Sequence, residues 1–328
     1  MAKNWHIRPY GLFVVATLLL LVLSAADLCC GSAFINPLGD SLTEMERQIL
    51  VNLRLPRIIT AVLAGMSLSL SGLLMQTLFR NPLAGPYILG VSSGAGLGVA
   101  LVTMCATLGT MHLAVGSFSI ALAAIIGANL VLLLVMAVAR RVESNVSLLI
   151  VGMMLGSIAG ALVSVLQNFA NPDSLKLFIV WTLGSLSSVG WGELQVLLPV
   201  VAIGVALCVV LIKPLNGLSL GENYARGLGV NVERVRTGIV LATGLLSGGV
   251  TAFCGPIAFV GVAVPHIARG LLRSGNHRLT MPACALIGAD LLLVCDIICN
   301  MGTYTLPVST MSALFGAPVI LWIILRKK

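Results

Sequence analysis

Two acidic residues within one apolar stretch are the clearest candidates for chemistry. Asp290 lies in the middle of the run 280–299, and Asp296 lies towards its end. A carboxylate inside a membrane costs several kcal/mol unless it is protonated or paired, so such a group is a candidate proton carrier. The alternative is a neutral aspartic acid that is hydrogen-bonded to a neighbouring helix. We favour this alternative for Asp290, because no basic residue is predicted near the middle of the membrane.

A second candidate is the segment Arg54-Leu-Pro-Arg57, whose two arginines lie three residues apart on one side of a helix. Proline is tolerated at a helix start, so Pro56 predicts that a helix begins here. Two roles fit the arginines: they anchor lipid headgroups, or they dock an acidic partner through bidentate pairs with its carboxylates. We favour docking, because basic residues are rare on the side of the membrane where this segment is predicted to lie.

The other reactive side chains form no catalytic or metal-binding pattern. The eight cysteines include no CxxC pair, and Cys295 and Cys299, which share a helix face, have no histidine beside them. Free buried cysteine behaves as a small hydrophobic residue. The sequence contains no P-loop, no Gly-x-Ser-x-Gly motif and no His-Glu-x-x-His motif. We therefore predict that the chain is not an enzyme and that it holds no metal and no cofactor.

Three glycines spaced four residues apart, Gly152, Gly156 and Gly160, share one face of a predicted helix. In membranes, small residues allow helices to approach each other closely, and close packing is the simpler interpretation of this pattern. The alternative is that the three glycines form a smooth lining along the pathway of a bulky solute.

The composition defines the elements that position these residues. The chain is 58% hydrophobic and only 9% charged, whereas a soluble domain carries roughly 25% charged residues. It is therefore predicted to be an all-α, polytopic membrane protein that forms a single transmembrane domain over 1–328. The ten predicted spans are 11–32, 57–79, 88–106, 113–139, 147–170, 194–212, 237–254, 257–270, 280–299 and 307–325.

Basic residues give the orientation of these spans. With ten spans, 15 of the 19 basic residues fall on one side, and only Arg47, Arg54, Arg57 and Lys176 fall on the other. The positive-inside rule then places both termini in the cytoplasm. The net charge of +8 is explained by this asymmetry and does not predict nucleic-acid binding.

The longest predicted cytoplasmic stretch, 213–236, is too polar to span a membrane. It contains a short helical segment between glycines, and the chain has no energy source of its own. We interpret this element as a docking site for a motor subunit, and the alternative is an ordinary solvated loop. The residues expected to couple the motor subunit to the membrane domain are Glu222, Ala225, Arg226, Gly227, Leu228 and Gly229.

Six segments together resemble the FecCD-type permeases of ATP-binding-cassette (ABC) importers, which carry iron-siderophores, haem or vitamin B12. The similarity covers roughly residues 45–326 in the order of that family. The matching segments are Arg54-Leu-Pro-Arg57, Arg80-Asn-Pro-Leu-Ala-Gly-Pro86 with Gln76 before it, Leu89-Gly-Val-Ser-Ser-Gly94, Ala225-Arg-Gly-Leu-Gly-Val230, Gly255-Pro-Ile-Ala-Phe-Val-Gly261 with Val264-Pro-His266, and Leu306-Pro-Val308 with Gly316-Ala-Pro318.

The resemblance implies a type II importer permease with ten helices that forms a homodimer in the bacterial inner membrane. Two cytoplasmic ATPases would bind the 213–236 element, and a periplasmic or lipid-anchored binding protein would dock outside. Arg54 and Arg57 are similar to arginines that receive glutamates of the binding protein. A third family arginine falls on Asn300, which weakens this docking scheme, whereas Asp296 matches a family aspartate. Two cytoplasmic gates are implied at Asn81 with Leu83 and at Ser144 with Asn145.

Two functional hypotheses follow. The first is an ABC importer permease for a bulky metal chelate, which requires a separate ATPase for transport. The second is a secondary transporter in which Asp290 carries a proton. The sequence does not choose among siderophore, haem and cobalamin as the substrate.

Overall fold

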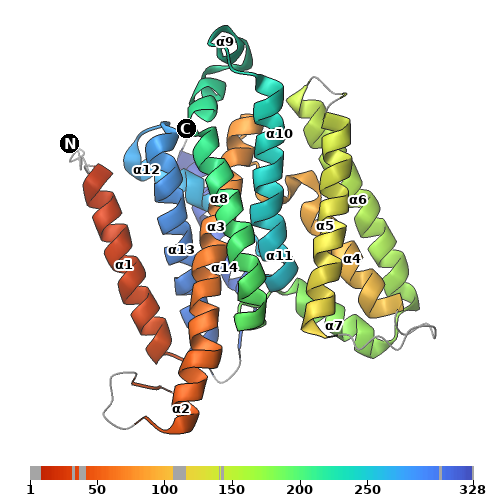
Figure 1. Cartoon of the computed structure of the whole chain (residues 1–328), viewed down its shortest axis with the longest axis vertical. Coiled ribbons are helices and arrows are strands. Elements are labelled where there is room, and N and C mark those ends of the chain that lie inside the picture. The colour runs from red at the N-terminus through yellow and green to blue at the C-terminus, as the bar shows by residue number, and fades with distance from the viewer. Residues whose placement is uncertain are drawn as a thin grey trace.

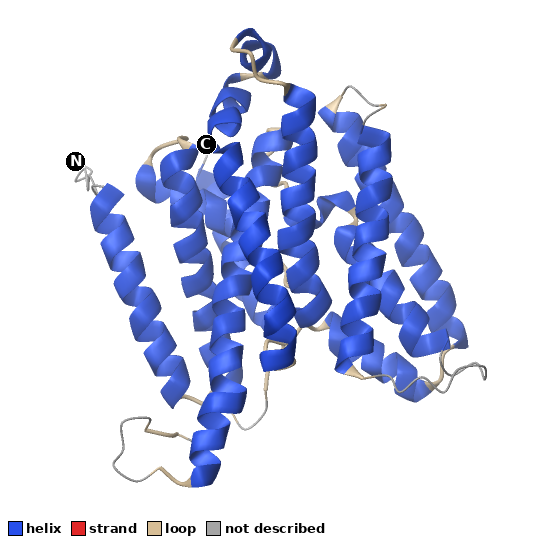
Figure 2. Cartoon of the chain, viewed as in Figure 1, coloured by secondary structure: helices blue, strands red, loops and turns tan. Residues whose placement is uncertain are grey.

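The computed structural model describes residues 9–31, 34–36, 42–105, 116–139, 141, 144–302 and 305–326. This part of the chain is almost entirely helical and contains no strand (Figures 1 and 2). Its α-helices are α1 (Pro9–Cys29), α2 (Glu44–Ile49), α3 (Leu55–Phe79), α4 (Val91–Cys105), α5 (Ser117–Ala139), α6 (Asn145–Phe169), α7 (Pro172–Thr182), α8 (Trp191–Leu220), α9 (Glu222–Gly227), α10 (Val232–Thr243), α11 (Gly249–Cys254), α12 (Val260–Leu272), α13 (His277–Asn300) and α14 (Val308–Arg326). Two π-helical turns, η1 (Leu50–Arg54) and η3 (Gly244–Gly248), and one 3-10 turn, η2 (Pro86–Leu89), connect some of them.

The predicted membrane fold is confirmed. In the described residues, seven helices are long and apolar enough to cross a membrane, and α4, α12 and α14 are shorter apolar helices. Each of the ten predicted spans has a counterpart among these helices. The ends of three predicted spans, at 32, at 106 and at 113–115, lie outside the described residues.

The predicted second span begins earlier than expected. Helical structure is continuous from Glu44 through η1 into α3. Thr43 and Glu46 form a capping box at its start, in which each side chain accepts the backbone N–H of the other residue. The π-helical turn ends at Arg54, two residues before Pro56, whose missing N–H and ring disturb regular α-helical pairing in the preceding turn. Pro56 therefore lies within the long helix and does not begin it.

Two further elements differ from the predicted pattern. Helix α8 continues to Leu220, so the first residues of the 213–236 stretch belong to a helix and not to a loop. Helix α7 was not predicted, because its 11 residues are too few to appear as a span. Its start has clear signals, since the Asn171 side chain accepts the Ser174 N–H at 2.8 Å and Pro172 occupies the first turn.

Helix α3 runs through the centre of the bundle and is packed backbone to backbone. A side-chain carbon on Gly65 would overlap the Gly288 carbonyl of α13, and one on Gly72 would overlap the Gly261 carbonyl of α12. Glycine lets the helices approach this closely, which is how van der Waals packing stabilises helix pairs in a membrane. The small residues of this sequence thus position α12 and α13 against α3.

The two ends of the bundle carry different elements (Figure 1). Helix α9 lies at one end, where α1 begins and α14 ends, and we call this the α9 end. Helices α2 and α7 lie at the opposite end, which we call the α2 end. The two termini of the described chain therefore lie on the same side of the bundle, as an even number of spans requires.

Candidate functional site

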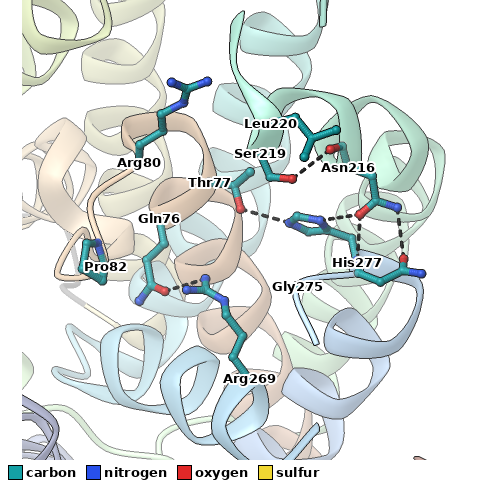
Figure 3. Close-up of a pocket in the computed structure, with 11 residues that line it drawn as sticks. Gln76, Thr77, Arg80, Pro82, Asn216, Ser219, Leu220, Arg269, Gly275 and His277 are labelled. Carbon is teal, nitrogen blue, oxygen red and sulfur yellow. Dashed lines mark hydrogen bonds between the residues drawn. The ribbon is translucent and has the colours of Figure 1, made fainter. Parts of the chain in front are cut away.

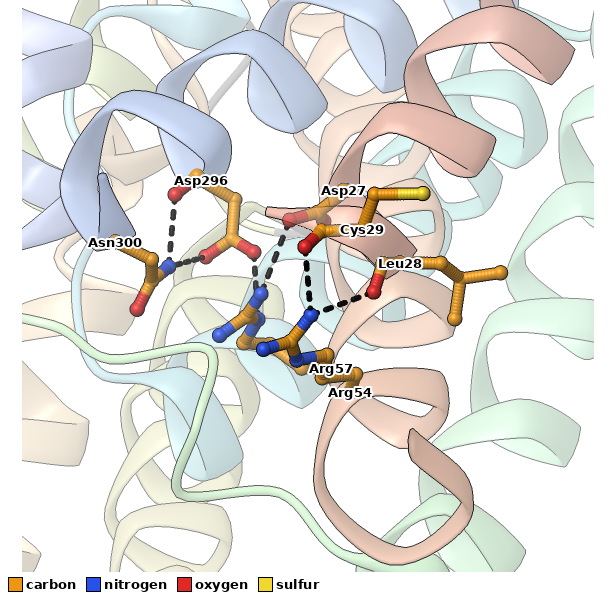
Figure 4. Close-up of polar contacts among 7 residues, drawn as sticks. All are labelled: Asp27, Leu28, Cys29, Arg54, Arg57, Asp296 and Asn300. Atoms are coloured by element: carbon orange, nitrogen blue, oxygen red, sulfur yellow. Dashed lines mark hydrogen bonds and ion pairs between the residues drawn. The ribbon is translucent and has the colours of Figure 1, made fainter. Parts of the chain in front are cut away.

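At the α2 end, Arg57 lies between two buried aspartates (Figure 4). Its Nη2 donates to Asp27 Oδ1 at 3.0 Å, and its Nε lies 2.8 Å from Asp296 Oδ2. The side chains of Asp27 and Asp296 are 0% and 1% exposed. Removing one partner from such a buried ion pair leaves an uncompensated charge. The arrangement therefore ties α1 and α13 to α3.

Arg54 completes this cluster with contacts to the end of α1 (Figure 4). Its Nη1 donates to the carbonyls of Leu28 and Cys29, at 2.7 and 3.0 Å. Asn300 contributes from α13, where its Nδ2 donates to the Asp296 carbonyl at 2.7 Å and to Asp296 Oδ1 at 3.1 Å. The formal charges of the two arginines and the two aspartates thus sum to zero. We call Asp27, Arg54, Arg57 and Asp296 the α2-end charge cluster.

The exposure of these arginines differs from the expectation. Arg54 and Arg57 are 4% and 8% exposed, so neither guanidinium is presented to the surface. The helix starts at Glu44, so both arginines lie within a long helix, where Asp27 pairs with Arg57 and the end of α1 accepts from Arg54. Asp27 and Asp296 already hold the Nη2 and Nε atoms of Arg57, so an acidic partner would compete with them for this guanidinium. Pairing with a binding protein stays a prediction for these residues.

Sequence reasoning missed Asp27. The available signal was an acidic residue near the end of an otherwise uncharged apolar helix, which predicts a cationic partner elsewhere in the bundle. Among the residues that the structure describes, Asp290 forms no ion pair. It is 6% exposed, and its Oδ1 is buried without a hydrogen-bond partner among the described residues, so the expected hydrogen bond is not seen at this atom.

The predicted gate and docking residues meet at the α9 end. Asn145 Nδ2 donates to Glu222 Oε1 of α9 and to the Leu78 carbonyl of α3, the latter at 3.0 Å. Ser144 caps α6 by accepting the Val146 N–H at 3.2 Å. The structure therefore brings Ser144 and Asn145 next to the start of α9, although Asn145 and Glu222 are 77 positions apart in the sequence.

The other gate pair lies on the loop after α3. Arg80 ends α3 in the left-handed conformation, with a φ of 47°, and its Nη2 donates to the Leu218 carbonyl at 3.2 Å. Asn81 Oδ1 then accepts the Leu83 N–H at 2.9 Å, which fixes a tight turn. Leu83 is 47% exposed. An exposed leucine in a fixed turn is suited to contacting a second surface.

Helix α9 has one buried and one exposed side. Ala225 is fully buried, whereas Leu228 is 60% exposed and Arg226 is also exposed. Gly229 has a φ of 81°, which turns the chain away after the helix. Beside Gly227, the space that a side-chain carbon would occupy is open. The element therefore presents a small mixed apolar and cationic surface beyond the bundle.

The three glycines of α6 do not behave alike. A side-chain carbon on Gly152 would lie 2.8 Å from the Ile88 carbonyl of η2, and Gly152 is buried. Gly156 is half-buried near Ser93, whereas Gly160 is exposed with nothing within 4 Å of that position. In this structure η2 covers Gly152, which fits the close-packing interpretation, and the pathway lining stays a prediction. Only Gly160 has an open surface.

A polar cavity of about 780 Å³ lies at the α9 end and was not predicted (Figure 3). In it, Arg269 Nη2 donates to Gln76 Oε1 at 2.7 Å, and a hydrogen bond of 3.0 Å joins Thr77 Oγ1 to His277 Nε2. Asn216 Oδ1 accepts the His277 N–H at 2.8 Å. These contacts connect α3, α8, α12 and α13. Among the described residues, no group of three His, Cys, Asp or Glu side chains could hold a metal ion.

The apolar helical bundle is that of a polytopic membrane protein, and the comparisons identify its class as a permease of the ABC importer type. The chain matches the FecCD transport family over residues 12–326, and it belongs to this family. The solved structure of a protein described as a metal-chelate type ABC transporter, in an inward-facing conformation, has a TM-score of 0.86 and 29% sequence identity. That similarity covers 96% of this chain and 98% of the other.

Curated relatives include vitamin B12 import permeases. The chain is 36% identical over 327 residues to BtuC, the vitamin B12 import system permease protein of Salmonella paratyphi A (strain ATCC 9150 / SARB42), covering 99% of this chain and 98% of that protein. It is 38% identical over 316 residues to the protein of the same name from Klebsiella pneumoniae, covering 95% and 92%. The similarity thus extends over nearly the full length of both chains.

Proposed function

We propose that this chain is the membrane subunit of an ATP-driven importer for a bulky metal chelate of the cobalamin class. The similarity to vitamin B12 import permeases over nearly the full length supports this proposal. The contact between Glu222 and Asn145 also supports it, because it links the proposed ATPase-docking element to a proposed gate. The chain is proposed to lie in the bacterial inner membrane with both termini and the α9 end in the cytoplasm.

The proposed assembly is a homodimer with two ATPase subunits and a periplasmic or lipid-anchored binding protein. ATP hydrolysis occurs on the partner subunits, and the permease supplies the pathway. In a twofold dimer, the loop carrying Asn81 and Leu83 meets its own copy near the axis. In a chain lacking its eight native cysteines, Leu83→Cys should form a disulfide between protomers whose yield changes with nucleotide. Tyr10→Cys, which is 83% exposed on the distant α1, is the control and should not crosslink.

The function is tested by uptake into proteoliposomes. The permease is reconstituted with its cognate ATPase and binding protein, and radiolabelled cyanocobalamin is compared with a ferric siderophore and haem. The proposal expects ATP-dependent accumulation of cyanocobalamin and none without the ATPase. Preferential accumulation of the siderophore or of haem would show that the substrate is not of the cobalamin class. No ATP-dependent uptake of any of the three compounds would refute the proposal.

The secondary-transport alternative is tested in the same vesicles. It requires uptake by the permease alone in a pH gradient, and it requires that Asp290→Asn abolish that uptake. The ABC proposal expects no uptake by the permease alone and retained ATP-driven uptake in the Asp290→Asn variant.

A further inference from the structure

Glu222 joins the start of α9 to two other helices. Its Oε1 accepts a hydrogen bond from Asn145 Nδ2 at the start of α6 and lies 4.0 Å from Arg236 Nη2 of α10. The Glu222 side chain is 27% exposed, whereas that of Arg236 is 6% exposed. A half-buried carboxylate with a cationic neighbour is held more firmly than one on the open surface. Glu222 is therefore well placed to move together with α9.

Asn145 links this carboxylate to the central helix. Its Nδ2 has two hydrogens, and the structure uses both, one for Glu222 and one for the Leu78 carbonyl near the end of α3. Helix ends leave carbonyls without intrahelical partners, and Leu78 is such a position. One amide group thus connects the start of α6, the end of α3 and the start of α9.

Helix α9 is a short helix that lies between two turns at glycines. Gly221, between α8 and α9, has a φ of 132°, and Gly229, after α9, has a φ of 81°. Other residues rarely adopt these angles, so glycine allows the backbone to turn at both points. Between the two glycines, Leu228 is exposed, while Ala225 is fully buried. Because Glu222 is the first residue of α9, any displacement of this helix also displaces the Glu222 carboxylate.

The surroundings of Asn145 leave room for a second arrangement. A cleft of about 610 Å³, lined by residues that include Arg80, Ser144 and Tyr224, lies beside it. The Asn145 Oδ1 atom is buried without a hydrogen-bond partner among the described residues. A buried acceptor without a donor is unfavourable, so the observed arrangement does not satisfy Asn145 fully. Movement of α6 into the cleft would give this oxygen access to new donors.

We propose that Glu222 is a positioning residue that transmits the movement of α9 to the gate through its hydrogen bond to Asn145. This inference rests on the proposed function, because it assigns α9 to ATPase docking and Asn145 to the gate. The inference adds the residue pair, Glu222 and Asn145, that connects the docking element to the gate. Binding or release of the ATPase at α9 would make or break one charge-assisted hydrogen bond and thereby shift the start of α6 relative to α3.

The main test compares single variants with a double variant in which the hydrogen-bond donor and acceptor exchange positions. Glu222→Ala removes the acceptor, and Asn145→Asp places two carboxylates side by side. The double variant Asn145→Asp with Glu222→Gln restores the hydrogen bond between these two side chains, because the glutamine amide donates to the new carboxylate, but it does not restore the hydrogen bond to the Leu78 carbonyl. Glu233→Ala on α10 is the matched control, since it removes an exposed carboxylate from the neighbouring helix. Each variant is purified as the complete complex with ATPase and binding protein.

Cyanocobalamin uptake and ATP hydrolysis are measured in the same proteoliposomes. We expect Glu222→Ala and Asn145→Asp to lower uptake per ATP by about tenfold, which corresponds to one charge-assisted hydrogen bond, while the ATPase still co-purifies. The double variant should exceed Asn145→Asp in uptake per ATP, because it regains the link to α9 although the hydrogen bond to the Leu78 carbonyl is still missing. Glu233→Ala should match the wild type. Normal uptake per ATP in Glu222→Ala would overturn the proposal. Loss of ATPase binding without recovery in the double variant would also overturn it, since Glu222 would then be a docking or folding residue.

A second readout does not depend on the substrate. Val146, next to Asn145, is 67% exposed, so Val146→Cys in the cysteine-free chain reports on the gate through its reaction with a membrane-impermeant maleimide. In the otherwise unchanged complex, ATP with vanadate should alter this rate, and Glu222→Ala should abolish the change. If the maleimide reaction rate still responds to nucleotide in Glu222→Ala, transmission through Glu222 is refuted, whereas the proposed function stands. Absence of both response and uptake in the unsubstituted complex refutes the proposed function itself.

Discussion

Arg57 Nε lies 2.8 Å from Asp296 Oδ2, and this contact joins the central helix α3 to α13 at the α2 end. The same guanidinium also holds Asp27 of α1, at 3.0 Å. Loss of a cation that pairs with two buried carboxylates costs more stability than loss of a surface ion pair, because both carboxylates would then be buried without a partner. Arg57, which the sequence pattern predicts as a docking group, therefore also has a structural role.

The first prediction concerns this pair. Arg57→Ala should lower the free energy of unfolding by about 3–5 kcal/mol, because it leaves Asp27 and Asp296 buried without their cation. Urea unfolding of the detergent-solubilised chain measures the change. Arg47→Ala, which removes an exposed arginine at the same end, should have almost no effect. Adding Asp27→Asn and Asp296→Asn to Arg57→Ala should restore much of the loss, and a triple variant no more stable than Arg57→Ala would contradict the explanation.

The second prediction concerns docking at the α2 end. Arg47 and Lys176 are exposed there, whereas Arg54 is 4% exposed. Reversing both exposed charges, with Arg47→Glu and Lys176→Glu, should weaken binding of the cognate binding protein about tenfold at low salt, and less at high salt. Arg54→Gln keeps a donor for the α1 carbonyls and should change the affinity less than about twofold. Binding is measured by surface plasmon resonance on nanodisc-embedded permease. The opposite ranking would show that the α2-end charge cluster opens to receive the partner.

The third prediction concerns the exposed side of α9. Arg226→Glu together with Leu228→Asp should reduce co-purification of the ATPase about tenfold or more, because both side chains project from the bundle and the substitutions introduce charge where an apolar contact is expected. The permease itself should still insert and should elute as before in size-exclusion chromatography. Arg234→Glu on α10 is the matched charge reversal, and ATPase binding should be retained in it. Equal co-purification in both variants would exclude α9 as the docking element.

The fourth prediction separates packing glycines from open ones. Gly72→Ala would drive a methyl group into the Gly261 carbonyl of α12, so we expect a loss of about 1–3 kcal/mol or more, or a failure to fold. Gly160→Ala meets nothing within 4 Å and should be tolerated. Thermal unfolding in detergent, followed by tryptophan fluorescence, compares the two. A stable Gly72→Ala variant would mean that α3 and α12 are less tightly packed than the structure shows.

Much of the architecture follows from local sequence patterns. Apolar runs predict the spans, because an apolar stretch of about 20 residues without charge is long enough to cross the hydrocarbon core of a membrane as a helix. Caps mark several starts, such as Ser144 before α6 and Asn231 before α10, where a side-chain oxygen accepts an N–H within the next three residues. The polar character of 221–230 likewise predicts an element outside the membrane. All of these signals depend on neighbours in the chain.

Contacts between helices were decided only by the tertiary structure. Arg57 and Asp27 are 30 positions apart, and Glu222 and Asn145 are 77 positions apart. No periodicity in either segment indicates that these side chains meet, because such pairs depend on how each helix is rotated and where it crosses its neighbour. The same reason explains why Gly152 is covered while Gly160, on the same helix face, is open. The sequence by itself determined which segments cross the membrane, and packing decided which charges became buried and which remained available to a partner.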